Sequence, residues 1–499
     1  MLTAAVLGST IAFVDESVVN VALPRIEADL GATLVAMQWV VNAYTLCLSA
    51  LLLIGGATAD QFGRRRLFIV GVTVFATASL GCGLAPHVAV LIGARVVQGV
   101  GAALLVPCSL ALIGAAFGEK ERGAAIGVWS GASAIAAGLA PLLGGALVDH
   151  ASWRVIFLIN PVLAVPTLWI AARHVPESRD PDAARGIDWR GALLAVSGLA
   201  SLVYGLIASS ERGWSDALIL GALAAGAVLL AAFVFAERGA RNPMMPLELF
   251  RSATFSGINA LTLLLYGALG GAFFFLPFLL IQARGYPATA AGAAYLPFTL
   301  ILGVLSRWSG GLMDRFGARG PLIIGPAVTA LGFALLALSG GYYRAVIGAM
   351  VVLGLGMAVT VAPLTTAVIN AVPEHRTGVA SGINNMVASV GGLLVIAVLG
   401  SLALGVFGRR LEAQLAHSHA SPAVSTAVRA ARGGFVVPVP PATLAAGERE
   451  RARQLVAEAL EATIARALWV AAALAAASAL TAGVSLDARS PARPRPPAS

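Results

Sequence analysis

Long apolar runs dominate this 499-residue chain and limit what it can fold into. Stretches of about 20 residues with almost no charge recur from one end to the other, and each could cross the roughly 30 Å hydrocarbon core of a bilayer. Hydrophobic residues make up 58% of the chain and charged residues only 11%, which excludes a soluble globular protein. Because the runs lack the alternating polarity of barrel strands, we predict an all-α polytopic membrane protein.

The apolar runs predict about fourteen spans. Their expected ranges are 3–24, 37–57, 67–86, 89–115, 124–147, 155–173, 191–209, 216–236, 254–280, 289–311, 321–340, 343–368, 379–405 and 466–486. The loops on one side of these spans hold 18 Arg and Lys residues, whereas the short loops on the other side hold five in all. Because basic residues gather on the cytoplasmic side, we expect both termini to be cytoplasmic, in a bacterial inner membrane.

Composition excludes several other classes of function. The loop arginines explain the net charge of +9, so we expect no nucleic-acid partner. The sole lysine, Lys120, is not part of a phosphate-binding loop, which argues against a nucleotide-driven pump. The six histidines fall in loops or at span ends, and no span holds a metal or nucleophile-base site. We therefore expect no enzyme activity, no metal and no cofactor.

Two adjacent carboxylates, Asp15 and Glu16, lie inside the first apolar run. An ionisable side chain well inside a bilayer is costly, by a few kcal/mol or more, so a functional role is the default hypothesis. On a helix the two side chains point about 100° apart and cannot face one partner equally. Asp15 is the stronger candidate for carrying a proton, and Glu16 is either a cavity residue or a structural one.

The chain contains an internal repeat. Five residues of one loop recur later at a constant offset: Gly56, Asp60, Phe62, Gly63 and Arg65 correspond to Gly310, Asp314, Phe316, Gly317 and Arg319. Both loops follow an even-numbered span, so the two halves have parallel topology. One surplus helix pair, most simply spans 7 and 8, lies between two six-helix halves.

The repeat defines the expected domain organisation. An N-terminal six-helix bundle covers 1–173, linkers and the inserted pair cover 174–253, and a C-terminal bundle covers 254–486. Within the last bundle, 408–465 is expected to be a long external loop, with a charged helical pattern in its second part. The Pro/Arg-rich end, 487–499, is expected to be a disordered cytoplasmic tail.

With this repeat, the chain resembles the major facilitator superfamily, and within it the fourteen-helix drug:proton antiporter family. Five stretches carry the resemblance: D-E-S-V-V-N-V-A-L-P at 15–24, G-A-T-A-D-Q-F-G-R-R-R at 56–66, R-V-V-Q-G-V-G-A-A at 95–103, G-L-A-P-L-L-G-G at 138–145 and W-R-V-I-F-L-I-N-P at 153–161. The resemblance implies two bundles that rock around a central cavity, with Asp15 exchanging protons.

Arg95 is the expected partner of Asp15. Asp15 lies about 13 Å along its helix from Pro24, and Arg95 enters its own span from the same side to a depth of about 9 Å. The two side chains could therefore meet, where burial favours the neutral acid and the arginine favours the carboxylate. A static ion pair that only locks the bundle is the alternative.

The repeated loops are expected to form a gate. Gly56 and Gly63 allow close helix approach and a tight turn, while Asp60 can cap a helix or pair with arginines across the halves. The other residues assigned to this gate are Arg64, Arg65, Asp314 and Arg319. Anchoring at the cytoplasmic surface would explain the arginines but not Asp60.

The fifth span carries what resembles the antiporter motif of the family, with Gly138, Pro141, Gly144 and Gly145. Small residues let this helix press against a neighbour, and the proline bends it, so the motif would seal one face of the cavity. Ala140 stands where the family usually has glycine, which weakens the antiport assignment. Generic membrane packing is the alternative.

Clues to the substrate are few. The residues expected to line an amphipathic cavity are Gln38, Trp39, Asn42, Trp129, Tyr266, Asn384 and Asn385. Packing between helices is the alternative for each of them. No acidic residue lies deep in spans 9 to 14, which makes broad export of polycations less secure.

Together these features predict a proton-coupled exporter of small amphipathic or hydrophobic compounds such as drugs or secondary metabolites. Its expected partners are the lipid bilayer, protons and a small-molecule substrate, and we expect a monomer. A proton-coupled uptake symporter would share the fold, but the fifth span resembles exporters rather than sugar permeases. A non-transporting sensor, the remaining alternative, would tolerate loss of Asp15.

Overall fold

Every element in the described part of the chain is a helix. The structure, a computed structural model, describes residues 1–179, 188–240, 242–373, 376–418, 420–435 and 445–486, without the side chains of 119, 120, 122, 306–308 and 310–315. Fourteen helical segments in these ranges are long and apolar enough to cross a membrane, which confirms the predicted number. Within a helix the backbone N–H and C=O groups hydrogen-bond to one another, whereas lipid offers them no hydrogen-bond partner.

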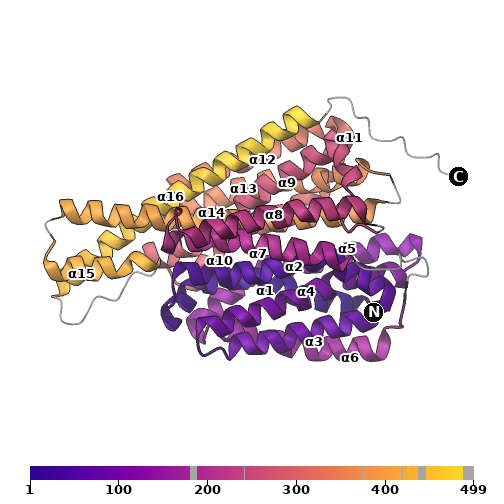
Figure 1. The fold of residues 1–499 in the computed structure, drawn as a ribbon, viewed down its shortest axis with the longest axis horizontal. Helices are drawn as coiled ribbons and strands as arrows, with labels where there is room; N and C mark the ends of the chain where they lie inside the picture. The colour runs from indigo at the N-terminus through magenta and orange to yellow at the C-terminus, as the bar shows by residue number, and fades with distance from the viewer. Residues whose placement is uncertain (180–187, 241, 374–375, 419, 436–444, 487–499) are drawn as a thin grey trace.

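The first six helices form one half of the molecule, drawn in indigo and violet in Figure 1. They are α1 (Leu2–Leu30), α2 (Leu34–Phe62), α3 (Arg64–Gly83), α4 (Val88–Ala116), α5 (Glu119–His150) and α6 (Val155–His174). α1 packs against α4, α5 and α6, while α3 packs against α4 and α6. α1 continues beyond Pro24, which lies inside the helix rather than at its end.

The second half follows an inserted helix pair. The pair is α7 (Trp189–Arg212) and α8 (Ala217–Gly239), followed by the short 3₁₀ helix η1 (Leu247–Arg251). The second half contains α9 (Ala253–Pro277), the π-helical turn η2 (Phe278–Ala283), α10 (Ala288–Ala293), α11 (Leu296–Phe316), α12 (Arg319–Leu338), α13 (Tyr343–Asn370), α14 (Thr377–His417), α15 (Pro422–Ala430), the 3₁₀ turn η4 (Ala431–Gly433) and α16 (Ala446–Ser485). The expected tenth span is therefore interrupted by a turn between α10 and α11.

The two halves meet along two seams. α2 packs against α14 on one side of the molecule, and α5 packs against α10 and α11 on the other. α7 covers the first seam, because it contacts both α2 and α14, and α8 packs on α7 (Figure 1). Leu199, Val203 and Ile207 of α7 join one apolar cluster with residues of α2 and α14. The inserted pair is thus a brace across one seam.

Several bonds join the halves at one end of the molecule, the end that holds the α1–α2 turn. Asp149, near the end of α5, accepts hydrogen bonds from the backbone N–H groups of Ala288 and Thr289 at 3.0 and 2.7 Å. Gln38 of α2 donates to the carbonyl of Ile396 in α14 at 2.7 Å. The seams are therefore closed at this end, which we call the joined end.

The stretch 408–465 is helical at both ends: the helix in its second part was expected from its charged pattern, whereas the helix at its start was expected to be part of a loop. α14 continues to His417 and α16 begins at Ala446, so both helices extend beyond the apolar spans predicted for them. They form an arm that projects from the helical body together with α15 (Figure 1). Glu412 of α14 pairs with Arg429 of α15 at 3.2 Å. This ion pair joins two helices of the arm, and hydropathy could not predict it.

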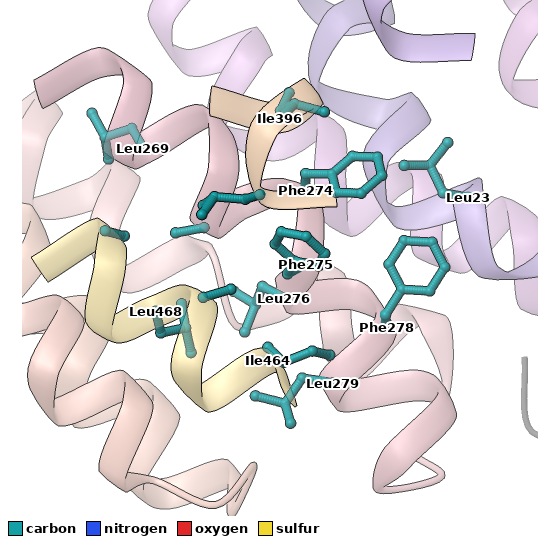
Figure 2. Close-up of a cluster of buried hydrophobic side chains, with 14 of the residues drawn as sticks. Leu23, Leu269, Phe274, Phe275, Leu276, Phe278, Leu279, Ile396, Ile464 and Leu468 are labelled. Carbon is teal, nitrogen blue, oxygen red and sulfur yellow. The ribbon is translucent and has the colours of Figure 1, made fainter. Parts of the chain in front are cut away.

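The chain returns from the arm to the joined end as a strap, residues 431–435. Phe435 is fully buried, with its ring centroid 5.3 Å from that of Phe407 and about 6 Å from those of Phe275 and Phe278. Figure 2 shows Phe275 and Phe278 in the core, with Phe278 near Leu23 of α1. The backbone N–H of Phe435 donates to buried Glu27 of α1 at 2.9 Å. The strap therefore touches both halves.

Replacing Phe435 with alanine is expected to release the strap, because most of its burial comes from this one ring. In the released strap the backbone at Arg432 opens to trypsin more often, since local opening governs such cleavage. We expect cleavage there to rise on the order of tenfold. Phe235→Ala, which removes a largely exposed ring from α8, is the matched control, and equal cleavage rates in the two variants would contradict the docking.

Candidate functional site

Asp15 and Arg95 meet inside the first half, as their depths predicted. Asp15 is fully buried and Arg95 is 1% exposed. One Nη1 hydrogen of Arg95 is donated to Oδ2 of Asp15, which makes this the one ion pair with both side chains buried among the described residues. α1 supplies the acid and α4 the base, and these two helices pack directly on each other.

Two amides complete the shell around Asp15. Gln98 of α4 donates from Nε2 to Oδ1 at 2.8 Å, and Asn160 of α6 donates from Nδ2 to the same oxygen at 2.8 Å. Asn160 also donates to the Ser79 hydroxyl of α3 at 2.9 Å. Sequence reasoning missed these three side chains, although Gln98 and Asn160 stand within the stretches that carry the family resemblance. Polar residues in the middle of predicted spans were the available signal.

Arg95 is held from several other directions. Its Nε donates to the carbonyl of Val40 at 3.0 Å, and its Nη1 also donates to Oε1 of Gln98 at 2.8 Å. The guanidinium lies over the Tyr44 ring, 4.2 Å from the centroid. This arrangement stabilises a charged carboxylate in an apolar bundle, because every donor points at Asp15 or fixes the arginine. Protonation of Asp15 would remove the charge for which the shell is built.

Glu16 is placed differently from Asp15. The residue is exposed although it lies in the middle of α1. Among the described residues, no hydrogen bond or ion pair to its carboxylate is found. The 100° turn between neighbours on a helix thus separates a sealed acid from an open one.

The first repeated loop is a tight turn that is held within its own half. Gly63 has φ +114°, a conformation that side chains disfavour, and it lets α3 begin directly after α2. Asp60 pairs with Arg64 across the turn at 2.8 Å. Glu177, which follows α6, accepts the backbone N–H groups of Arg65 and Arg66 at 3.1 and 3.2 Å. The sequence allowed Asp60 to pair with arginines of the other half. Among the described residues, its ion pair is with Arg64 of its own half.

The remaining residues assigned to the gate are Gly56, Arg319 and Asp314. A side-chain carbon at Gly56 would lie 3.7 Å from its nearest neighbour, so Gly56 is not required for close packing. The close approach is at Gly55, where such a carbon would lie 2.0 Å from the carbonyl oxygen of Ala103. In the second loop, Arg319 donates to the carbonyl of Gly483 at 2.7 Å, within its own half. The side chain of Asp314 lies outside the described residues.

The three glycines of the motif in α5 pack against three helices, α1, α10 and α11. A carbon added at Gly144 would lie 2.2 Å from Val18 of α1, and one at Gly138 would lie 1.9 Å from Thr299 of α11. At Gly145 the nearest atom is the carbonyl oxygen of Ala288, at 2.2 Å. Pro141 lies inside the helix, as expected. The motif therefore lets α5 touch α1 and the second half at once.

Most residues expected to line a cavity are packed between helices. Gln38 and Asn42 are fully buried, and Asn384 donates to Thr262 of α9 at 2.8 Å. Trp129 donates from its indole nitrogen to Ser9 at 2.9 Å. Trp39 packs on the cluster around α7, and Tyr266 packs on the main core. Of this set only Asn385 is exposed.

Known proteins resemble this chain over most of its length. Residues 5–396 match the family model described as Major Facilitator Superfamily. The multidrug resistance protein Stp of Mycobacterium tuberculosis is 36% identical over 427 residues, which cover 84% of this chain and 79% of the relative. The tetracenomycin C resistance and export protein of Streptomyces glaucescens is 35% identical and covers 80% and 75%. The puromycin resistance protein of Streptomyces alboniger is 36% identical and covers 82% of each chain.

Solved structures share the fold. A bacterial homologue of the human lysosomal transporter Spinster, in an inward-facing and unoccupied conformation, superposes with a TM-score of 0.68. The match covers 96% of each chain at 18% sequence identity. At this identity the likeness concerns the arrangement of helices alone.

Proposed function

Because this chain belongs to the major facilitator superfamily and is a multi-pass transporter rather than an enzyme, we propose that it exports small amphipathic or hydrophobic compounds in exchange for protons. Three relatives carry drug or antibiotic resistance in their names, and one is named an export protein. The substrates of those relatives differ, so the proposal concerns drugs or secondary metabolites as a class.

The sealed shell of Asp15 is the observation that carries the proton-coupling part of the proposal. Three side chains donate to the carboxylate of Asp15, and Arg95 is the one among them that carries a positive charge. A proton on Asp15 would free Arg95 to change partners, and the contact between α1 and α4 would change with it. Proton binding and helix arrangement are thereby linked through one ion pair.

Alternating access supplies the rest of the mechanism. The joined end is assigned to the outer face, on the basis of the basic residues in the opposite loops. Outside protons load Asp15, substrate leaves outward, and the loaded carrier returns and releases the proton inside. Each uncompensated charge moved contributes about 2.3 kcal/mol per 100 mV. The carrier works as a monomer in the cytoplasmic membrane, with both termini inside. The repeated loops and the α5 glycines control the opening of the central cavity.

The test is proton movement in inverted vesicles. Addition of a transported compound from a panel that includes puromycin should release protons from acid-loaded vesicles that contain the wild type. Asp15→Asn should abolish this release, because the side chain can no longer carry a proton. Asp29→Asn, an exposed acid of the same helix, is the matched control and should behave like the wild type.

Three outcomes would contradict the proposal. If Asp15→Asn still drove uphill transport with unchanged proton dependence, the coupling residue would be wrong. If the compounds moved in the same direction as protons, the uptake symporter would replace the exporter. A transporter that moved none of the panel and tolerated Asp15→Asn in its cellular role would favour the sensor.

A further inference from the structure

We propose that Asp188 and Glu237 bind one proton between them, and that this proton closes a latch at one end of the inserted helix pair. Asp188 caps the start of α7, and Glu237 lies in the last turn of α8. Neither residue takes part in the transport mechanism proposed above, so the inference goes beyond that function. It gives the inserted pair a task of its own.

The two carboxyl groups face each other across Gly191 of α7. A carbon added at Gly191 would lie 2.5 Å from Oδ2 of Asp188 and 2.6 Å from Oε1 of Glu237. Both oxygens therefore border one small space that is open only because a glycine stands there. Both are buried, and neither accepts a hydrogen bond from a donor among the described residues. Glu237 is 3% exposed, so bulk water does not reach its carboxyl group.

The other oxygen of each acid is already bonded. Oδ1 of Asp188 accepts the backbone N–H of Gly191 at 2.9 Å, which caps α7. Oε2 of Glu237 accepts the backbone N–H of Met245 at 2.8 Å. These bonds fix both carboxyl groups and leave Oδ2 and Oε1 for each other. The arrangement therefore lacks one hydrogen between two acceptors.

A shared proton supplies that hydrogen. Two adjacent carboxylates repel each other where water is excluded, whereas one proton turns the pair into a strong O–H···O⁻ hydrogen bond. A metal ion suits the place less well, because Ca²⁺ and Mg²⁺ take about six ligands or more and this pair offers two free oxygens. Within the part of the chain that the structure describes, no three acids, histidines or cysteines gather as a metal site would require.

Charges on the neighbouring elements do not neutralise the pair. α8 packs on α7 and η1, and α7 packs on α2 and α14. Among the described residues, the charge that acts on Glu237 is that of Asp188. The other acids at this end have arginine partners, and the other arginines are exposed or paired. These residues are Asp60, Arg190, Arg238, Glu248, Arg251 and Arg376.

The latch lies where the inserted pair connects to the second half (Figure 1). Thr33, in the turn of the joined end, donates to Glu211 of α7 at 3.5 Å, so Asp188 lies at the opposite end, which is assigned to the cytoplasm. Met245, held by Glu237, leads into η1, which packs on α9. Loss of the proton would push the ends of α7 and α8 apart. The brace across the seam therefore loosens as the cytoplasmic pH rises.

Hydrogen exchange of the full-length protein in lipid nanodiscs, followed by mass spectrometry, tests the latch. Wild type and Glu237→Gln are compared at each pH, so the intrinsic pH dependence of exchange cancels. The glutamine amide can donate permanently to Oδ2 of Asp188 and thus mimics the shared proton. In the first turns of α7 and in 243–249 we expect equal exchange at about pH 6, and exchange at least about fivefold faster in the wild type at about pH 8.5. Glu211→Gln, an exposed acid at the other end of α7, is the matched control and should follow the wild type.

A ratio between wild type and Glu237→Gln that stays constant between the two pH values would overturn the latch, as would faster exchange in Glu237→Gln at both. Slower exchange of the wild type on addition of Mg²⁺ or Ca²⁺ at the higher pH would assign the pair to a metal ion instead and overturn the shared proton. Unchanged thiol exposure of the variants verifies folding, since all three cysteines are free and buried.

A glycine substitution tests the same place independently. The carbon added by Gly191→Ala displaces both carboxyl oxygens, so we expect fast exchange at both pH values. Gly221→Ala on α8, with no neighbour within 4 Å, is the matched control and should keep the pH dependence of the wild type. Equal behaviour of the two alanine variants would contradict the latch. None of these measurements involves a substrate, so failure of the Asp15→Asn test leaves them intact.

Discussion

Replacing Arg95 with leucine is expected to abolish transport and to lower the stability of the folded protein by about 3–5 kcal/mol. The reason is the carboxylate that remains. Asp15 is fully buried and would lose its charge partner, while the carbonyl of Val40 and the Tyr44 ring would also lose their contacts with the guanidinium. Thermal unfolding, followed by labelling of the three buried cysteines, measures the loss.

A second substitution separates stability from coupling. Asp15→Asn in the Arg95→Leu background removes the orphaned charge, so we expect thermal stability to recover by at least half while transport stays lost. Arg451→Leu, an exposed arginine of the arm, is the matched control and should leave the unfolding temperature unchanged. An Arg95→Leu protein as stable as this control would show that the ion pair does not hold the bundle together.

Replacing Gly145 with alanine is expected to reduce turnover by at least tenfold in a protein that still folds. The added carbon would lie 2.2 Å from the carbonyl oxygen of Ala288, and the next neighbours are backbone atoms of Ala288 and Thr289. Backbone cannot rotate away as a side chain can, so α10 must retreat from α5. The hydrogen bonds that the N–H groups of Ala288 and Thr289 donate to Asp149 would then lengthen, and the joined end could not close.

Gly131→Ala is the matched control for this effect. It makes the same change in the same helix at a position with no neighbour within 4 Å. Both alanines favour helix by about 1 kcal/mol, so a difference in turnover reports the seam and not helix propensity. Initial rates of export in vesicles, normalised to the amount of folded transporter, provide the measurement. Equal turnover of the two variants would mean that close contact at this seam is not needed for transport.

Hydropathy and helix geometry were sufficient to predict several features of the fold and the site. The number of spans was predictable because the bilayer sets the length of each apolar run. The meeting of Asp15 and Arg95 was predictable because a fixed rise of 1.5 Å per residue converts sequence position into depth. The repeated glycines and acids at Asp60 and Asp314 indicated the two halves without any structure.

Other features could not be predicted, because the decisive neighbour is far away in the chain. The glycine of the close approach between α2 and α4 is Gly55 and not Gly56, because rotation of α2 about its axis determines which one meets Ala103. The continuation of α14 to His417 and the docking of Phe435 depend on contacts among segments that the sequence does not relate. Glu177 is close to Arg65 only because α6 ends beside α3.

By itself the sequence determined which residues lie at which depth in the membrane, and therefore the spans, the two halves and the pairing of Asp15 with Arg95. Only the tertiary structure decided which way each side chain faces. It brought Gln98 and Asn160 to Asp15, left Glu16 open, and closed Gln38 against α14. The physical reason is that lipid and protein interior are both apolar, so hydropathy identifies a spanning helix but carries little information about its rotation.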